Sequence, residues 1–252
     1  KMNFIKSIFD SRNVLKNVLE IKGYKSSEIE DLSIEELDEL YDGSTISNDV
    51  NDKFSFSINH KDIPQQQIHI RYYNLPKKGD TKSLRVTRKL ISDIDALYED
   101  DDVNYEDNCI YIINEKMSDS IYELIYKYNV NHLESYDNDE IDDLNPTIQD
   151  FLKRDDNNYN FRSIHNIHIV WLNILSFNPL DHILVPKHRI IKDDKEIETI
   201  LGKCNCSKKD LPGIYSYSDP IAILLGAMKG DLCEVIRINK HSGLSYNYRI
   251  CV

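Results

Sequence analysis

The chain has 252 residues and a net charge of -12, and both numbers limit what it can be. At about 150 residues per domain, the length predicts one or two domains with an apolar core each, and we start from two. The excess of acidic residues argues against a free-standing nucleic-acid-binding protein, because that affinity depends on cations that displace counterions from phosphates. No stretch approaches the ~20 apolar residues of a membrane span, and residues 1–24 carry charges where a signal peptide is apolar. We therefore expect a soluble protein that is not secreted and has no membrane partner.

The chain begins with two predicted helices. Apolar residues recur at helical spacing over residues 3–22, and Gly23 supplies the stop at the end of this helix. A second helix begins at Ser33, where the hydroxyl of Ser33 and the carboxylate of Glu36 satisfy free backbone N–H groups reciprocally as a capping box.

Strands and helices then alternate. Apolar and polar residues alternate over residues 54–58 and 68–73, which predicts two half-buried strands. Residues 82–98 show an apolar stripe at helical spacing, and residues 109–113 form a short apolar strand that precedes a helix capped by Ser118. This order favours an α/β layer.

The segment around the predicted helix 82–98 is basic although its surroundings are acidic. Its cations are Lys77, Lys78, Lys82, Arg85, Arg88 and Lys89. One interpretation is a solvated helix face, since many helices carry one charged face. The other is a contact with phosphates or with a neighbouring protein, which would carry no base specificity.

The distribution of charge predicts a domain boundary. Residues 134–160 are rich in Asp, Asn and Glu and hold too little apolar surface to offset the entropy of ordering, so we expect a solvated insertion there. A β-rich stretch at 167–175 follows. Residues before position 179 carry a net charge of -14 and those from 179 onward carry +2. This shift and the Asn-Pro turn at 178–179 predict domains at 1–178 and 179–252.

The second domain has clear helix caps. Asp193 with Glu196 frames a helix start, and Gly202 is the predicted stop of that helix. Asp219-Pro220 is an N-cap followed by a first-turn proline, and Gly226 ends that helix.

Two final strands, at 232–238 and 245–252, form a predicted hairpin that closes the domain. One face of the last strand, which we expect to lie in the core, carries Tyr246, Tyr248, Ile250 and Val252.

A set of residues recurs in one order through the C-terminal part of the chain: His182, Val185, Pro186, His188, Leu211, Pro212, Asp219, Pro220, Gly226, Gly230, Arg237, Tyr248 and Arg249. Together they resemble the assembly domain of the common fifth subunit of eukaryotic DNA-directed RNA polymerases, a domain similar to the corresponding small subunit of archaeal RNA polymerases. A weaker resemblance extends upstream through the first helix, the Ser33 helix and strands 68–73 and 109–113, which favours the eukaryotic type.

The resemblance implies an α/β (α+β) protein. Its N-terminal jaw domain would resemble a degenerate restriction-endonuclease-like fold, and its C-terminal assembly domain would be a small mixed α/β structure. The implied function is that of a non-catalytic structural subunit, without a cofactor, that docks on the largest polymerase subunit. The jaw would lie near downstream duplex DNA, to which the basic segment is a candidate contact.

The chain also departs from the family pattern. The family's usual Asp-Pro-Val-Ala-Arg-Tyr is Asp-Pro-Ile-Ala-Ile-Leu at 219–224, and the loop at 239–246 lacks the usual Ser-Glu-Thr-Ala-Gly-Arg-Tyr. These departures and the Asn-, Ile-, Lys-, Asp- and Tyr-rich composition favour a divergent source, an A+T-rich eukaryote or a large DNA virus. The expected location is the nucleus for a cellular protein, and a cytoplasmic viral factory or the virion for a viral one.

Two other functions compete with the polymerase subunit. A free-standing transcription adaptor would use the same assembly fold. A degenerate nuclease would need a carboxylate and a Glu-x-Lys pair for a hard metal ion, whereas strand 68–73 presents His69 and Arg71, and Glu115-Lys116 has no intervening residue.

A zinc site is also weighed, because four potential ligands lie in one region: Cys204, Cys206, His182 and His188. Their spacing does not match a standard zinc motif, so we expect structural or incidental thiols and no metal. Five cysteines, an odd number spread thinly over the chain, favour a reducing compartment over a disulfide framework.

Overall fold

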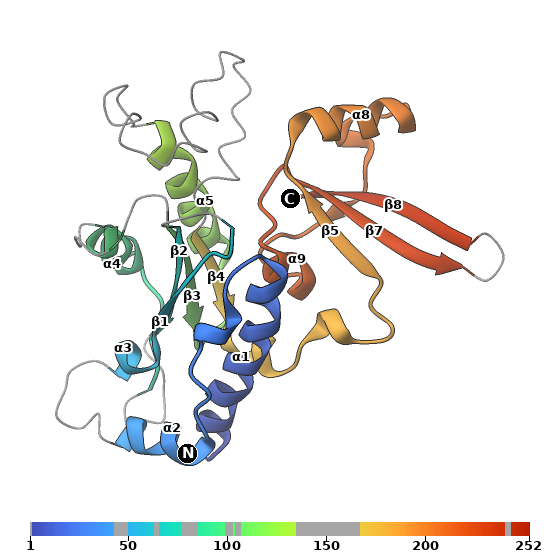
Figure 1. The fold of residues 1–252 in the computed structure, drawn as a ribbon. Helices are drawn as coiled ribbons and strands as arrows, with labels where there is room; N and C mark the ends of the chain where they lie inside the picture. Colours follow the sequence, from blue (N-terminus) through green and yellow to red (C-terminus); the bar gives the residue numbers. More distant parts are fainter. Residues whose placement is uncertain are drawn as a thin grey trace. The chain divides into compact units, whose positions relative to one another are not determined.

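The computed structural model describes residues 2–42, 50–62, 66–76, 85–98, 103, 107–134, 167–239 and 243–252. The chain divides into two compact units. The N-terminal unit comprises Lys1–Ile125 and Asn166–Asn178, and the C-terminal unit comprises Tyr126–His165 and Pro179–Val252. Each unit has its own sheet (Figure 1). Within the described residues, no helix is long and apolar enough to span a bilayer.

The expected acidic insertion, apart from Glu134 at the end of a helix, lies outside the described residues. The α/β fold class predicted from the sequence is confirmed, since helices pack on both sheets. The two predicted domains, 1–178 and 179–252, stay a prediction about which segments fold independently.

The sheet of the N-terminal unit has four strands in the order β1-β2-β3-β4. The strands are β1 (Phe56–Asn59), β2 (Gln67–Tyr73), β3 (Asn108–Ile113) and β4 (Ile167–Trp171). The first pair is antiparallel and the other two pairs are parallel. Five of the six residues of β3 are buried, because helices cover both faces of this central strand.

One face of this sheet packs against α1 (Met2–Ile21). The hydroxyls of Ser11 in α1 and Tyr72 in β2 are 2.7 Å apart, and the guanidinium of Arg12 lies 4.7 Å from the ring centre of Phe56. The next helix, α2 (Ile34–Asp42), begins with the predicted capping box. The backbone N–H of Ser33 donates to the Glu36 carboxylate at 2.7 Å, and the N–H of Glu36 donates to the Ser33 hydroxyl at 3.2 Å.

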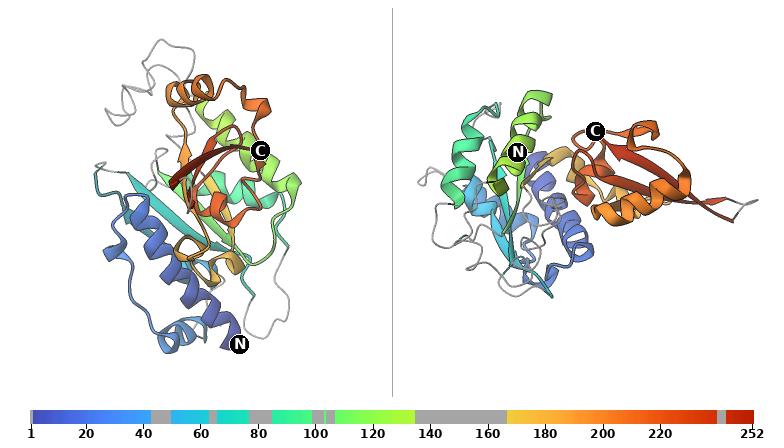
Figure 2. Two further views of the ribbon diagram at one scale, coloured as in Figure 1. Left: turned by 90° about the vertical axis from the view of Figure 1, so that its right-hand side faces the viewer. Right: turned by 90° about the horizontal axis from the view of Figure 1, so that it is seen from above.

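The opposite face contacts α4 (Lys89–Tyr98), where the Tyr73 hydroxyl donates to Asp93 at 2.7 Å. Two more helices follow the same alternation with strands, α3 (Val50–Phe54) and α5 (Asp119–Glu134). Figure 2 shows α1 and α4 on different sides of the strands.

Two predicted elements of this unit are wrong in extent. The strand expected at 54–58 begins at Phe56, because Phe54 ends α3. The helix expected at 82–98 begins only at Lys89, because the Thr87 hydroxyl accepts the N–H of Lys89 and the Thr87 carbonyl accepts the N–H of Leu90. A local cap thus starts the helix later than the apolar stripe indicates.

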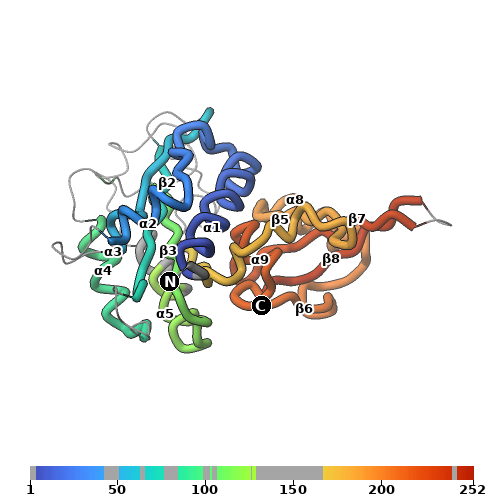
Figure 3. Tube along the Cα trace, turned by 90° about the horizontal axis from the view of Figure 1, so that it is seen from below, coloured from blue at the N-terminus to red at the C-terminus, as the bar shows by residue number. Residues whose placement is uncertain are grey.

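The sheet of the C-terminal unit has the order β5-β7-β8-β6. Its strands are β5 (Lys187–Ile191), β6 (Gly213–Ile214), β7 (Leu232–Asn239) and β8 (Gly243–Cys251). The long β7–β8 hairpin is antiparallel, and β6 pairs in parallel with the last residues of β8 (Figure 3). Because the N–H of Val252 donates to Ile214 at 2.9 Å, the chain end is held inside this sheet.

Two helices cover the two faces of this sheet. α8 (Asp194–Cys204) packs Ile197 and Ile200 against one face, while α9 (Pro220–Leu225) packs Ala222 against the other. Asp219 caps α9 by accepting from the N–H groups of Ile221 and Ala222, and Gly226, with φ of 71°, ends the helix as predicted.

The predicted end of α8 is wrong. Gly202 lies inside the helix, which continues to Cys204, and Asn205 adopts the left-handed conformation with φ of 49° instead. Asparagine tolerates this conformation better than most residues, so the glycine is not needed as a stop.

Candidate subunit interface

Most residues of the assembly-domain motif hold the C-terminal unit together. Asp219, Pro220 and Gly226 begin and end α9. Gly230, with φ of 93°, donates its N–H to Cys251 at 2.8 Å, and the carbonyl of Pro212 accepts the N–H of Ile250 at 3.0 Å. Leu211 packs against the apolar cluster beneath α8. This part of the motif fixes α9, the end of β8 and the apolar cluster beneath α8, so it contributes to the fold.

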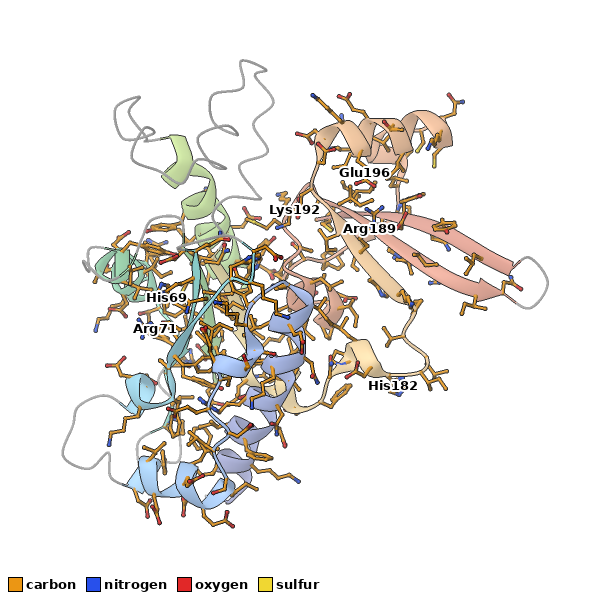
Figure 4. The ribbon with its side chains drawn as sticks, viewed as in Figure 1. His69, Arg71, His182, Arg189, Lys192 and Glu196 are labelled. Atoms are coloured by element: carbon orange, nitrogen blue, oxygen red, sulfur yellow. The ribbon has the colours of Figure 1, made fainter. Side chains whose placement is uncertain are left out.

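A second group forms a polar network on the sheet. Arg189 in β5 donates to Glu196 in α8 at 2.8 Å and to Glu234 in β7 at 3.1 Å, and Figure 4 shows Arg189 and Glu196 in the same region. The Tyr248 hydroxyl donates to Glu234 at 3.1 Å. The pKa of Arg189 is raised, first by its hydrogen bond to Glu196 and second by its hydrogen bond to Glu234. Arg249 donates separately to the carbonyl of Gly213 at 3.2 Å.

The sequence did not indicate the central member of this network. Glu234 is 7% exposed in a strand whose neighbours are apolar, and it accepts from both Arg189 and Tyr248. An acidic residue within a buried strand needs hydrogen-bonding partners to offset its lost hydration. A single Glu among the apolar residues of a predicted strand is therefore the sequence signal that could have identified Glu234.

The motif residues at the start of the unit form a turn with an apolar tip. The N–H of Leu184 donates to Nδ1 of the exposed His182, and the N–H of Val185 donates to the His182 carbonyl. The turn leaves Ile183 95% exposed and Leu184 82% exposed. Val185 and Pro186 are half-buried, and Nδ1 of the half-buried His188 donates to the Pro186 carbonyl at 2.7 Å. The motif is therefore partly structural and partly an exposed apolar surface.

The far end of the β7–β8 hairpin exposes a second apolar surface. The strand register pairs Ile236 with Tyr246 and Ile238 with Leu244, so that all four side chains share one face. Ile238 is 88% exposed, Leu244 58% and Tyr246 54%. We call these four residues the hairpin patch.

The hairpin patch continues the buried face that α8 covers. Leu232 and Tyr248 lie on the same face nearer the root, where they pack with Ile197 and Ile200 of α8. The hairpin extends past α8 (Figure 1), so its outer half has no covering helix within the described residues. The prediction that this face of the last strand lies in the core is therefore only partly right. Tyr248 and Ile250 are half-buried, but Tyr246 is exposed and Val252 lies beyond β8. On the opposite face, Cys251 is buried.

The opposite face of the hairpin end is polar. Arg237, Asn239, Ser245 and Asn247 alternate with the patch residues along the two strands, and Arg237, Asn239 and Asn247 are exposed. A solvated sheet face is normally polar in this way. The exposed apolar side chains of the hairpin end are therefore confined to one face. An exposed apolar patch of this kind is typical of a surface that another protein covers.

The basic segment of the N-terminal unit does not form the predicted helix face. Lys77, Lys78 and Lys82 lie outside the described residues. Arg85 and Arg88 precede α4, and Lys89 is the first residue of that helix. These last three residues are exposed and lie within one short segment at the helix N-terminus.

The residues considered for nuclease chemistry have structural partners. His69, 2% exposed, contacts the fully buried Asp107 at 3.1 Å through Nε2 and the Ser57 hydroxyl at 2.7 Å through Nδ1. Asp107 also accepts the N–H of Gln67 at 2.7 Å, so this carboxylate ties β2 to the segment before β3. Figure 4 shows Arg71 two residues farther along β2.

The described residues do not assemble a site for zinc or for a hard metal ion. Within the described ranges, no group of three or more His, Cys, Asp or Glu residues is arranged to hold a metal. Cys204 is the last residue of α8, Cys206 follows its C-cap Asn205, and both are free cysteines.

Comparison with known proteins identifies relatives of the C-terminal unit. Residues 177–251 match the family model described as RNA polymerase Rpb5, C-terminal domain. A protein of Methanocaldococcus jannaschii named DNA-directed RNA polymerase subunit Rpo5 is 43% identical over 72 residues, which is 29% of this chain and 90% of that protein. The protein of the same name from Thermococcus kodakarensis is 41% identical over 76 residues, or 30% of this chain and 90% of that protein.

Proposed function

This chain belongs to the Rpb5/Rpo5 family of DNA-directed RNA polymerase subunits, and we propose that it is a structural, non-catalytic subunit of such an enzyme. Its partners are other polymerase subunits, and the C-terminal unit docks on the largest of them. The N-terminal unit contributes to the jaw near downstream DNA.

The hairpin patch is the observation that supports docking through the C-terminal unit. Three of its four side chains are more than half exposed, although they lie on the face that forms the core nearer the root. Moving a Leu or Ile side chain out of water is worth about 1.5–3 kcal/mol, so the paired Ile238 and Leu244 alone offer a partner substantial binding energy. The apolar turn at Ile183 and Leu184 is a second contact of the same chemistry.

A matched pair of double variants tests this assignment. Ile238→Lys with Tyr246→Lys places two cations on the hairpin patch, and Asn239→Lys with Asn247→Lys places two cations on the neighbouring positions of the opposite face. Each chain is co-expressed with the largest subunit, and the recovered complex is quantified. We expect the patch variant to lose at least about 2 kcal/mol, roughly thirtyfold in affinity, because central apolar residues dominate binding energy.

The control variant should assemble within about threefold of the unaltered chain, because exposed rim substitutions change affinity little. Circular dichroism must show both variants folded. If the patch variant assembles as well as the control, docking does not use the hairpin patch. If both variants lose assembly equally, charge on the hairpin and not the apolar face decides the outcome.

The two rival functions lack support of this kind. The relatives named above are polymerase subunits, which does not favour a free-standing adaptor. The buried Asp107 already accepts hydrogen bonds from Gln67 and His69, which does not favour a nuclease centre around β2.

A weak contact between the jaw and DNA is supported by the position of the basic residues. Arg88 and Lys89 lie at the N-terminus of α4, where the helix dipole disfavours cations. Within the described part of the chain, neither residue has an acidic partner. Cations placed against the dipole and without such a partner suit an external anion, and the phosphates of duplex DNA fit that requirement.

Charge reversal tests the DNA contact in the assembled polymerase. Arg85→Glu, Arg88→Glu and Lys89→Glu together should leave incorporation intact and weaken the grip on downstream DNA at low salt. The difference from the unaltered enzyme should shrink as salt rises, because counterions screen phosphate contacts. Normal DNA binding by the variant at low salt would contradict the contact.

The location of the chain follows from the proposed assembly. It would be found where its polymerase works, in the nucleus for a cellular enzyme, and in a cytoplasmic factory or the virion for a viral one. Imaging of the tagged chain together with the largest subunit tests this, because separate distributions would contradict it.

A further inference from the structure

One edge of the C-terminal sheet is open along part of β8. The strand order places β8 between β7 and β6, but β6 pairs only with Ile250 and Cys251 of β8. On the other side of the hairpin, β5 pairs with β7 as far as Ile236. The hairpin end extends past β6 (Figure 3). Over residues 244–248, the side of β8 that faces away from β7 therefore has no neighbouring strand in the part of the chain that the structure describes.

A proline explains why β6 pairs no farther along β8. The N–H of Ile250 donates to the Pro212 carbonyl at 3.0 Å. The next bond of this parallel ladder would join the N–H of residue 212 to the carbonyl of Tyr248. Proline has no N–H, so the ladder ends there and the edge beyond it stays open.

The hydrogen bonds at the chain end show which backbone groups face the open edge. The N–H of Ile250 points to the β6 side, whereas the N–H of Cys251 donates to the Asp231 carbonyl on the β7 side at 2.9 Å. Successive residues of a strand direct their N–H and C=O groups to opposite sides. The residues that direct these groups to the open edge are therefore Leu244, Tyr246 and Tyr248. Among the described residues, none of these backbone groups has a partner.

The open edge lacks the features that normally protect a sheet edge from another strand. Charged residues and prolines are the usual protection. The edge strand β5 has both, since it follows Pro186 and carries the exposed Lys187 and the cation of Arg189. Residues 244–248 of β8 read Leu-Ser-Tyr-Asn-Tyr, with no charge and no proline. This edge is therefore suited to pairing with a further strand.

We propose that the open edge of β8 binds an extended segment of the largest polymerase subunit, which becomes a fifth strand of the C-terminal sheet. This inference rests on the docking proposed above and gives its geometry. Backbone hydrogen bonds to residues 244–248 provide the attachment, and the side chains of the added strand provide the specificity.

The two faces of the hairpin define the sequence of the added strand. Its side chains alternate between the faces, so every second one lies beside the hairpin patch and is apolar. The others lie on the polar face, where Arg237 is exposed and Arg249 is half-exposed. Neither arginine forms an ion pair within the described ranges. Acidic residues at these positions of the segment would complement the two cations.

Residue-level hydrogen exchange tests strand addition in the co-purified complex with the largest subunit. In the isolated chain, the amides of Leu244, Tyr246 and Tyr248 should exchange freely, while those of Ser245, Asn247 and Arg249 are protected by bonds to β7. In the complex, we expect exchange at the first three amides to slow by at least about tenfold, because each N–H that points to the edge can then donate to the added strand.

A matched pair of substitutions separates the backbone bond from side-chain contacts. Tyr246→Ala and Tyr246→Pro both remove the ring of this patch residue, but only proline also removes the N–H at the open edge. The isolated chain makes no bond with that N–H, so the proline variant should fold, as circular dichroism can show. We expect it to assemble about tenfold more weakly than the alanine variant, since the acceptor in the added strand loses its donor.

The outcomes distinguish this inference from the docking on which it rests. If no complex forms with the unaltered chain, the docking is wrong and the strand addition is wrong with it. If a complex forms but the three amides still exchange freely, or the proline and alanine variants assemble equally, the partner covers the hairpin without adding a strand. Protection of these amides in the isolated chain, rising with its concentration, would show that a second copy occupies the edge and would also overturn the proposal.

Discussion

The two units of the chain differ in where they place polar side chains. Among the described residues, six of the nine buried polar or charged ones belong to the N-terminal unit, and Ser11, His69 and Asp107 join helices and strands inside its core. The C-terminal unit uses polar groups at helix caps, at its chain end and in the network around Glu234. Its long hairpin instead leaves apolar residues in water.

This difference indicates what each unit needs from a partner. The sheet of the N-terminal unit is covered on both faces, so its described core is complete within the chain. The C-terminal unit covers only the inner half of its hairpin with α8. A partner that completes this face would stabilise the complex through the same apolar contacts that stabilise the root of the hairpin.

Truncation of β8 should have the largest effect, because it should unfold the C-terminal sheet and leave the N-terminal unit folded. A chain ending at Leu244 loses most of β8, so β6 loses the strand with which it pairs and β7 keeps only its pairing with β5. The loss of buried Cys251 and of Ile250 adds to this, and a native stability of about 5–15 kcal/mol cannot absorb the sum. Limited proteolysis should digest residues 179–244, while the fluorescence of Trp171 in the N-terminal unit stays unchanged.

The converse fragment sharpens the domain boundary. Residues 179–252 alone should fold and bind the largest subunit, as measured by circular dichroism and pull-down. If the chain truncated at Leu244 keeps a protease-resistant C-terminal unit and still binds, the boundary and the docking surface are both wrong.

Alkaline pH should unfold the N-terminal unit first. Burial raises the pKa of Tyr24 and of Tyr72 from 10.0 to about 12. A folded-state pKa above the unfolded value means that the stabilisation is complete below pH 10 and disappears as the pH rises toward 12. Each of the two tyrosines should lower the free energy of unfolding by roughly 2–3 kcal/mol over this pH range. Trp171 fluorescence against pH measures the transition.

The matched variants for this prediction are Tyr24→Phe and Tyr72→Phe. Each removes a hydroxyl that titrates, so each should move the alkaline transition to higher pH even where it lowers stability at neutral pH. An unchanged transition in both variants would show that these tyrosines do not cause alkaline unfolding.

Helix caps should contribute less, and more in the C-terminal unit than in the N-terminal one. Asp219→Ala removes an acceptor for two N–H groups, those of Ile221 and Ala222, and should cost about 1–2 kcal/mol. Ser33→Ala removes one exposed acceptor and should cost about 0.5–1 kcal/mol. Urea denaturation of both variants measures the difference, and a larger loss for Ser33→Ala would contradict this ranking.

The smallest expected effect has the opposite sign. Replacing Arg88 and Lys89 by alanine should stabilise the isolated chain by about 0.3–1 kcal/mol, because it removes cations from a helix N-terminus. Thermal unfolding monitored by Trp171 measures this gain. A loss of stability would mean that the two cations support the fold, which would weaken the case for an external anion.

Local chemistry in the sequence was sufficient to predict some elements. Asp219-Pro220 and Gly226 bound α9, and Ser33 with Glu36 begins α2, because a cap depends on a few neighbouring residues. The late start of α4 at Lys89 was missed, since Thr87 caps the helix inside an apolar stripe that continues upstream.

The candidate interface could not be predicted in the same way. The alternation that includes Tyr246, Tyr248 and Ile250 indicates that one face of the strand is apolar. The pattern is the same whether that face is buried or exposed. Whether that face is covered depends on where α8 ends relative to the hairpin, which is a tertiary property. The sequence therefore identified the family through its motif, and the structure identified the hairpin patch.

If this chain is a stoichiometric subunit of an RNA polymerase, it should be recovered with that enzyme on native purification. The chain is tagged, recovered from the organism or infected cell that produces it, and the bound proteins are quantified by mass spectrometry. We expect recovery of the largest polymerase subunit in a one-to-one ratio with the chain. Recovery of the chain without large polymerase subunits would contradict it.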